Sequence, residues 1–171
     1  MLSNSELKSL VHQQPSACAI INGIMSHPNL LGLANFYQTD VGVLVFVRVK
    51  GLPLNPQACG PSFFGMHIHE GSTCTGTGSD PLADTGLHYN PNNCLHPEHA
   101  GDLPPLIGSG GDSLILVLTD HFSVEEIIGR TIVIHASPDD FKTQPAGNSG
   151  AKIACGEIMM GGCIANNLFF S

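Results

Sequence analysis

Residues 30–49 read LLGLANFYQTDVGVLVFVRV, two apolar runs joined by a short polar turn. Leu, Val and Phe at this density, with turn residues between the runs, predict two antiparallel strands over residues 30–38 and 41–49. The longest clean apolar run, VGVLVFV from Val41, is far shorter than the roughly 18 residues that a membrane-spanning helix needs. The sequence therefore predicts a sheet here and argues against an integral membrane protein.

The same signature continues on both sides of this hairpin. It predicts further strands over residues 17–25, 63–69, 113–119, 131–136 and 152–159, and a turn at Glu125 and Glu126. Several short strands joined by long excursions fit an antiparallel sandwich or a flattened barrel, in which few strand edges stay open. We therefore expect an all-β fold of about eight strands.

Length and composition indicate one folded domain. The chain has 171 residues, of which 12% are charged and 42% hydrophobic, with 20 Gly and 12 Pro. This apolar content excludes a disordered chain, and the high Gly and Pro content favours many turns over long helices. Residues 1–15 are polar and unpatterned, so we expect a loose tail there and a single β domain over residues 16–171.

The chain is acidic, and its charges are unevenly placed. A net charge of -8 removes the basic footprint that nucleic-acid binding needs. Residues 51–129 contain no Lys or Arg but hold nine of the acidic residues and six of the nine histidines, so this stretch can recruit cations. The N-terminal residues show no secretory signal, and we therefore expect a cytoplasmic protein.

A long segment without hydrophobic period, residues 71–105, carries candidate metal ligands. Ordered loops of this length are usually functional or tied down by a metal ion or a disulfide. His96, His99 and Asp102 follow one another at intervals of three, and they offer two imidazoles and a carboxylate to a divalent ion. His88 precedes them and could complete this set.

Three histidines lie on or beside predicted strands. His67 and His69 are two residues apart, so their side chains point to the same face of a strand and can offer two nitrogens to copper or zinc. His135 ends the strand that reads TIVIH. His88 could equally complete this second set. The six histidines and Asp102 would make two four-ligand sites if one histidine were shared.

The six cysteines show no C-x-x-C spacing, which excludes zinc-ribbon and thioredoxin-like sites. In a reducing compartment a cysteine is usually a small buried hydrophobe, and we expect this of about four of the six, while one isolated disulfide stays open. For Cys94, two residues before His96, we favour a core position over an extra metal ligand. The six are Cys18, Cys59, Cys74, Cys94, Cys155 and Cys163.

Five sequence blocks, in order, resemble the copper,zinc superoxide dismutases. They are GMHIHEGSTC at 65–74, TGLHYNP at 85–91, HAGDL at 99–103, GRTIVIHA at 129–136 and GNSGAKIACGEI at 147–158. Five ordered blocks are far more specific than one motif. The resemblance implies an eight-stranded antiparallel Greek-key barrel or sandwich with two long functional loops.

The resemblance also implies roles for single residues. It implies that copper is bound by His67, His69, His88 and His135, and zinc by His88, His96, His99 and Asp102. It implies that His88 bridges the two ions and supplies a proton, and that Cys74 and Cys155 form a disulfide. It further implies that the Asp139 carboxylate holds one histidine of each set by its outer N–H group, the alternative being a plain turn residue.

Three departures from the family bear on activity. Lys152 stands where the family usually has an arginine that docks the anion; lysine keeps the charge but loses the planar fork, so we expect weaker docking, and a merely solvated lysine is the alternative. Residues 137–150 form a short loop in which only Lys142 is basic, so steering should be weak. His96 and His99 are closer together than is usual, which makes copper binding the firmer expectation.

The main functional hypothesis is therefore an oxidoreductase: a superoxide dismutase that converts superoxide to oxygen and hydrogen peroxide with a copper ion and a zinc ion. The alternative is a dismutase-like copper store or carrier with little turnover, and a third is a structural or interaction sandwich with incidental histidines. Dimers are common in the family, so a homodimer is a further expectation. The apolar end IMMGGCIANNLFFS, residues 158–171, would cover the barrel or form a subunit contact.

Overall fold

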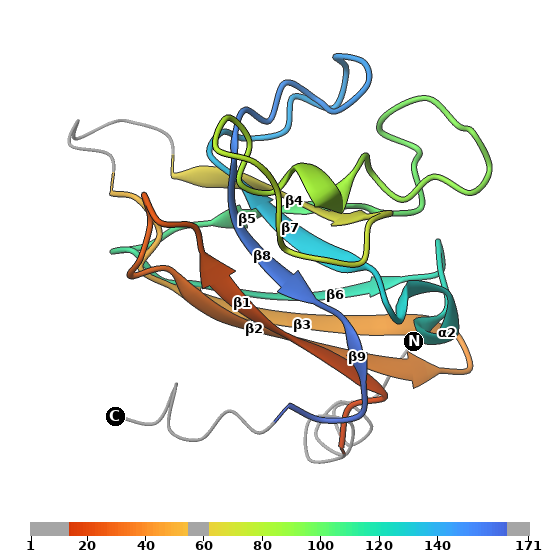
Figure 1. Cartoon of the computed structure of the whole chain (residues 1–171). Helices are drawn as coiled ribbons and strands as arrows, with labels where there is room; N and C mark the ends of the chain where they lie inside the picture. Colours follow the sequence, from red (N-terminus) through yellow and green to blue (C-terminus); the bar gives the residue numbers. More distant parts are fainter. Residues whose placement is uncertain (1–13, 55–61, 164–171) are drawn as a thin grey trace.

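The computed structural model describes residues 14–54 and 62–163, which form an antiparallel, nearly closed β-barrel (Figure 1). The strands are β1 Ala17–Gly23, β2 Leu31–Thr39, β3 Gly42–Lys50, β4 Phe63–His69, β5 Asp102–Ile107, β6 Ser113–Thr119, β7 Thr131–His135, β8 Lys152–Glu157 and the two-residue β9 Met159–Met160. Two short helices, η1 Ala83–Thr85 and α2 Val124–Ile127, lie in connections. The expectation of an all-β fold with eight antiparallel strands is confirmed, and no helix of the described residues could span a membrane.

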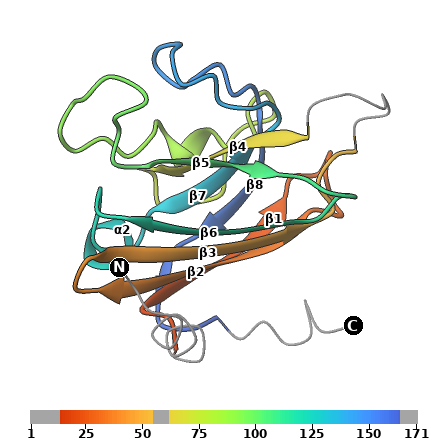
Figure 2. The same cartoon turned by 180° about the vertical axis from the view of Figure 1, so that it is seen from behind.

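The strands follow the order β5-β4-β7-β8-β1-β2-β3-β6, with β9 paired to β1. The two ends of this path, β5 and β6, lie side by side (Figure 2). The connections from β3 to β4 and from β6 to β7 join strands that are not neighbours, which gives the Greek-key arrangement. The barrel therefore has two halves, with β4, β5, β7 and β8 opposite β1, β2, β3 and β6.

Residues that point into the core alternate along the strands with residues that point outward. On β3, Val43, Val45, Val47 and Val49 are buried in the core, and the residues between them point outward. β4 is different, because it is buried on both faces from Phe64 to His69. Its outward face is covered by the two long loops, residues 70–101 and 136–151, which lie on the same side of the barrel (Figure 1).

Some predicted boundaries were wrong. The expected loop over residues 71–105 ends in strand β5, whose Pro104 and Pro105 hide the strand signal. β5 pairs only with β4, and an edge strand tolerates proline. The expected turn at Glu125 and Glu126 is helix α2, which a capping box between Ser123 and Glu126 begins.

Two disulfides cross-link the described part of the chain. Cys74–Cys155 is present, as the resemblance implied. A second bridge joins Cys18 to Cys163, so four of the six cysteines are paired and the expectation of about four unpaired, buried cysteines was wrong. Cys94 is free and exposed, so the expectation of a core position for it was also wrong. Some predictions concern residues that the structure does not describe. These are Cys59, nearly all of the expected tail over residues 1–15, and residues 164–171 of the expected domain.

Candidate metal centre

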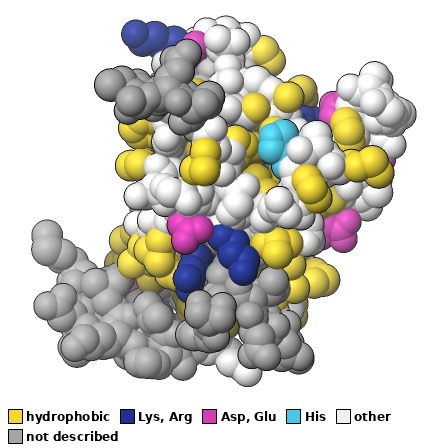
Figure 3. All heavy atoms as spheres, turned by 90° about the vertical axis from the view of Figure 1, so that its left-hand side faces the viewer, with side chains coloured by type: hydrophobic (Ala, Val, Ile, Leu, Met, Phe, Trp, Pro, Cys, Tyr) yellow, Lys and Arg dark blue, Asp and Glu magenta, His cyan; other side chains and the backbone are white. Residues whose placement is uncertain are grey.

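Two groups of potential metal ligands meet beneath the long loops. The first consists of His67, His69, His88 and His135, and the second of His88, His96, His99 and Asp102. In each group, one ligand atom from every residue lies within 4.8 Å of the others. All six histidines are buried, and on the face shown in Figure 3 histidine reaches the surface in one small patch. The structure thus brings all seven predicted ligands together, the closely spaced His96 and His99 included.

Strand pairing places the first group, which we call the copper cluster. His67 and His69 alternate with core residues on β4, so both point outward beneath the loops. β7 pairs with β4, and its last residue, His135, therefore reaches the same face. An isolated bridge between His69 and His88 draws the long loop onto the end of β4.

The rings of His69 and His135 are held as neutral ligands. The Nδ1 of His69 donates to the Gly86 carbonyl at 3.0 Å, and the Nδ1 of His135 donates to the Gly150 carbonyl at 3.3 Å. Both Nε2 atoms therefore carry lone pairs, and they face each other at 3.3 Å. Burial holds the pKa of His69 well below its usual value and, together with the neighbouring His67, lowers the pKa of His135 to about 3.

The other two histidines of the copper cluster present unpartnered nitrogens. The Nε2 of His67 donates to Asp139 Oδ2 at 2.7 Å, which leaves its Nδ1 buried without a hydrogen-bond partner. The Nε2 of His88 is likewise buried and unpartnered. Buried polar atoms are almost always satisfied, so such orphaned lone pairs in one cluster fit a bound cation.

The second group, which we call the zinc cluster, converges on Asp102. Its Oδ1 lies 2.7 Å from His88 Nδ1, and its Oδ2 lies 3.0 Å from His96 Nδ1 and 3.3 Å from His99 Nδ1. Burial alone would raise the pKa of Asp102, but the hydrogen bond from His88 and the neighbouring histidines lower it, so the carboxylate stays ionised. Three imidazole nitrogens and one carboxylate form the donor set of a tetrahedral zinc site.

Asp139 links the two clusters. Its Oδ2 accepts from His67 Nε2 at 2.7 Å, and its Oδ1 accepts from His96 Nε2 at 2.9 Å. The backbone N–H of Phe141 also donates to Oδ1, at 2.7 Å. Burial would raise the pKa of Asp139, yet these three hydrogen bonds lower it to about 2. Gly147 has a φ of 64° and no side chain, because a Cβ there would collide with this carboxylate.

Lys152 lies on β8 beside the copper cluster, and it is not a freely solvated lysine. Its Nζ donates to the carbonyl of Leu82 at 3.1 Å and lies 3.6 Å from Asp80 Oδ2, with 17% of the side chain exposed. Its charge is among the smaller causes, after burial, that lower the pKa of His135. Sequence reasoning missed Asp80, since no local pattern ties this loop residue to β8.

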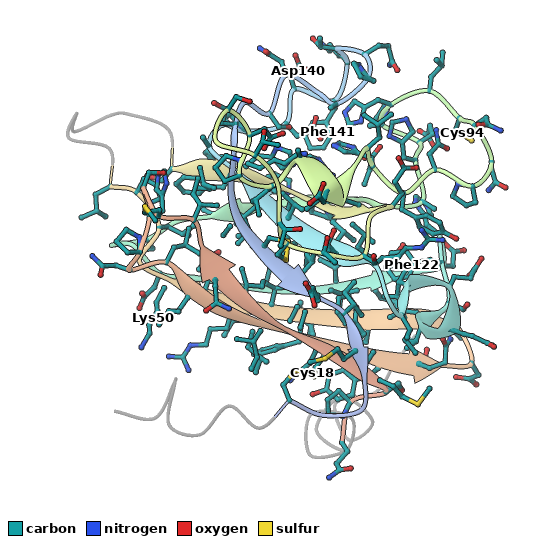
Figure 4. The ribbon with its side chains drawn as sticks, in the orientation of Figure 1. Cys18, Lys50, Cys94, Phe122, Asp140 and Phe141 are labelled. Carbon is teal, nitrogen blue, oxygen red and sulfur yellow. A yellow bond between two sulfur atoms is a disulfide. The ribbon has the colours of Figure 1, made fainter. Side chains whose placement is uncertain are left out.

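The Cys74–Cys155 bridge fastens the long loop to β8, and Cys155 packs with Leu82 and Val133 outside the barrel core. Cys94 belongs to neither cluster, and Figure 4 shows it on the outer part of that loop. The disulfide, the bridge between His69 and His88, and Lys152 are among the contacts that hold the long loop on the barrel.

Comparison with known proteins agrees with this arrangement. The family model described as copper/zinc superoxide dismutase matches residues 30–158. The chain is 32% identical over 150 residues to a copper-zinc superoxide dismutase of Aquifex aeolicus, covering 79% of this chain and 82% of the relative. It is 34% identical over 148 residues to one of Arabidopsis thaliana, covering 76% of this chain and 83% of the relative.

A solved structure shares the fold as well. The copper/zinc superoxide dismutase of Brucella abortus superposes with a TM-score of 0.68 at 26% identity, covering 82% of this chain and 98% of that one. The matched region contains both ligand clusters, Asp139 and the Cys74–Cys155 bridge. From fold, site geometry and sequence alike, this chain belongs to the copper/zinc superoxide dismutase family.

Proposed function

We propose that this chain catalyses the disproportionation of superoxide to oxygen and hydrogen peroxide. Copper would be held by His67, His69, His88 and His135, and zinc by His88, His96, His99 and Asp102. When bound, copper supplies one-electron chemistry by alternating between +2 and +1, and zinc, which has no redox chemistry, fixes the geometry. The observation that carries this proposal is the sharing of one buried imidazole, His88, by two complete ligand sets.

His88 is suited to moving a proton. Its Nδ1 lies 2.7 Å from Asp102 Oδ1, so the ring is anchored on the zinc side. Its Nε2 faces the copper cluster with no hydrogen-bond partner. A ring held at one nitrogen can take up a proton at the other and donate it as peroxide forms. We assign His88 this role alongside its place in both ligand sets.

Lys152 is the residue to which we assign docking of the substrate anion. Its side chain is largely buried near His135, on a protein whose net charge is -8. An acidic protein needs local positive potential at the place where a small anion reacts. The carbonyl of Leu82 fixes the ammonium, but the Asp80 carboxylate reduces its field.

The experiment that tests this function compares two histidines. His88→Ala, reconstituted with copper and zinc, should remove superoxide about 100-fold or more slowly than the unchanged chain, because a positioned proton donor contributes at least this much. His121→Ala is the matched control, since His121 is exposed and belongs to neither cluster. Equal rates for the His88 variant and the unchanged chain would contradict the proposal.

Compartment and assembly stay predictions. Disulfides persist mainly in oxidising surroundings, so the Cys18–Cys163 bridge makes the expected cytoplasmic location worth testing by fractionation of the source cells. Recovery outside the cytoplasm would overturn that expectation. The expected homodimer is tested by sedimentation.

A further inference from the structure

The backbone of His96 is held by one side chain of the other long loop. The Oε1 of Gln144 accepts from the His96 N–H at 3.0 Å, and the Nε2 of Gln144 donates to the His96 carbonyl at 2.7 Å. In the part of the chain that the structure describes, neither of these backbone groups has another hydrogen-bond partner. One amide thus satisfies both backbone polar groups of a zinc-cluster histidine, as a neighbouring strand would.

The ring of His96 is held by the same loop. Asp139, five residues before Gln144, accepts from His96 Nε2 at 2.9 Å. Residues 136–151 therefore fix His96 at its ring and at its backbone, although His96 belongs to the loop of residues 70–101 (Figure 1). The position of this ligand thus depends on contact between the two loops and not on its own segment alone.

His99 is held in a different way, by Asp102 at the start of β5. The N–H of His99 donates to Asp102 Oδ2 at 3.1 Å. The Nδ1 atoms of His96 and His99 both approach this same oxygen, at 3.0 and 3.3 Å, although only two residues separate the two histidines. Nδ1 is the ring nitrogen nearer the backbone, so a shift of the backbone at His96 moves its donor atom directly. Gln144 is the side chain that opposes such a shift.

The turn that carries Gln144 is fixed by its own backbone. The N–H of Asp140 donates to the Gly147 carbonyl at 2.8 Å, and the N–H of Gly147 donates to the Thr143 carbonyl at 2.7 Å. Gln144 itself is exposed, and ordering an exposed glutamine costs rotamer entropy. Two hydrogen bonds from one amide can offset this cost where a single one barely would. The geometry therefore fits a clamp on His96 and not a freely solvated side chain.

We propose that Gln144 is a positioning residue for zinc, which fixes the His96 backbone so that the Nδ1 atoms of His96 and His99 meet at Asp102. This rests on the zinc ligand set of the proposed function. Among the described residues, Gln144 forms hydrogen bonds only with His96 and Lys142. Its loss therefore weakens zinc binding and leaves the copper cluster in place, whereas Asp139 holds one histidine of each cluster.

Gln144→Met tests the proposal, because methionine keeps the length of the side chain but cannot donate and accepts only weakly. In the copper-loaded, disulfide-bonded chain, zinc affinity measured by competition with a chelator should fall about tenfold, while copper content stays unchanged. Cobalt(II) in place of zinc reports geometry, and its visible absorption, intense at a tetrahedral site, should weaken and shift. Gln144→Glu keeps the acceptor but not the donor, so its zinc affinity should lie between the two.

Gln38→Met is the matched control. The Gln38 amide also bonds to backbone, accepting from the Val124 N–H at 2.8 Å at the start of α2 and donating to the Thr39 carbonyl at 3.1 Å. The same substitution there removes the same kind of contact away from both ligand sets. Zinc affinity and the cobalt spectrum should match those of the unchanged chain, even where the protein unfolds at a lower temperature.

Equal zinc affinity and an unchanged cobalt spectrum in Gln144→Met would overturn the proposal. An equal loss in Gln38→Met would also overturn it, because the effect would then reflect stability alone. An unchanged chain that binds neither zinc nor cobalt would refute the zinc ligand set and this inference with it. Full metal binding with negligible superoxide turnover would refute only the enzymatic function, since zinc affinity still decides the role of Gln144.

Discussion

The Nε2 atoms of His69 and His135 face each other at 3.3 Å, although neither carries a proton when both Nδ1 atoms donate to backbone carbonyls. Two lone pairs at this distance repel, and a cation shared between them removes the repulsion. Adding a proton to either ring is disfavoured, because burial lowers both pKa values. The fold thus keeps these rings neutral, and the free energy of unfolding of the metal-free protein therefore depends on pH.

Acid should destabilise the metal-free protein. In the unfolded chain a histidine binds its proton near 6.5, whereas folded His135 does so only near 3. Between these values the unfolded state binds more protons, so the free energy of unfolding falls as pH is lowered. The lowered pKa values of His67 and His69 act in the same direction. The thermal midpoint of chelator-treated protein should therefore fall as pH drops below 6.5 toward 3; a flat profile would contradict the buried neutral rings.

Asp139→Asn should weaken binding of both metals. Asn keeps the shape of the side chain but can accept through only one oxygen, so either His67 or His96 loses its acceptor. Loss of such an outer partner typically lowers metal affinity about 10–100-fold, which competition with a chelator would measure. Asp140→Asn is the matched control, because among the described residues that carboxylate accepts hydrogen bonds only within its own turn, from Lys142 and Thr143. An equal effect of both changes would argue against the linking role.

Asp80→Asn should increase turnover. The change removes the carboxylate 3.6 Å from the Lys152 ammonium and so raises the positive potential beside the copper cluster. Steering then gains roughly twofold to tenfold in kcat/KM at low ionic strength, and the gain should shrink as salt is added. Asp84→Asn removes the same charge from the same loop, where the carboxylate accepts from the Thr75 hydroxyl instead. A similar gain for this control would assign the effect to net charge alone.

Removing the Cys74–Cys155 bridge should destabilise the protein. Replacing both cysteines by serine frees the long loop from β8, and loss of a native disulfide typically costs about 2–5 kcal/mol. Urea unfolding of the metal-loaded protein measures this loss. Cys94→Ser should leave the midpoint unchanged, because Cys94 is free and exposed. An unchanged midpoint for the double variant would show that the metals, not the bridge, hold the loop.

The parts of the structure that sequence predicted depend on local patterns. Apolar runs separated by turn residues located β2 and β3, and the two-residue spacing of His67 and His69 placed both side chains on one face of β4. β5 escaped prediction because Pro104 and Pro105 resemble loop residues, and only its pairing with β4 shows them to be at a strand edge.

Long-range relationships could not be predicted in this way. Cys18 and Cys163 are 145 residues apart, and no spacing rule pairs them. The same holds for Asp80 and Lys152, which meet only because the long loop folds back on β8. Asp139 was identified only through the resemblance to a family. Its hydrogen bonds with His67 and His96 bring together three separate segments of the chain, which no local pattern predicts.

The most direct test of the central claim combines metal analysis with activity on the same samples. Metal-free protein would be reconstituted with copper and zinc, bound metal per chain measured, and superoxide loss followed. The two clusters predict one copper and one zinc per chain together with rapid turnover. Full metal content with negligible turnover would contradict the enzymatic function and favour a copper store or carrier.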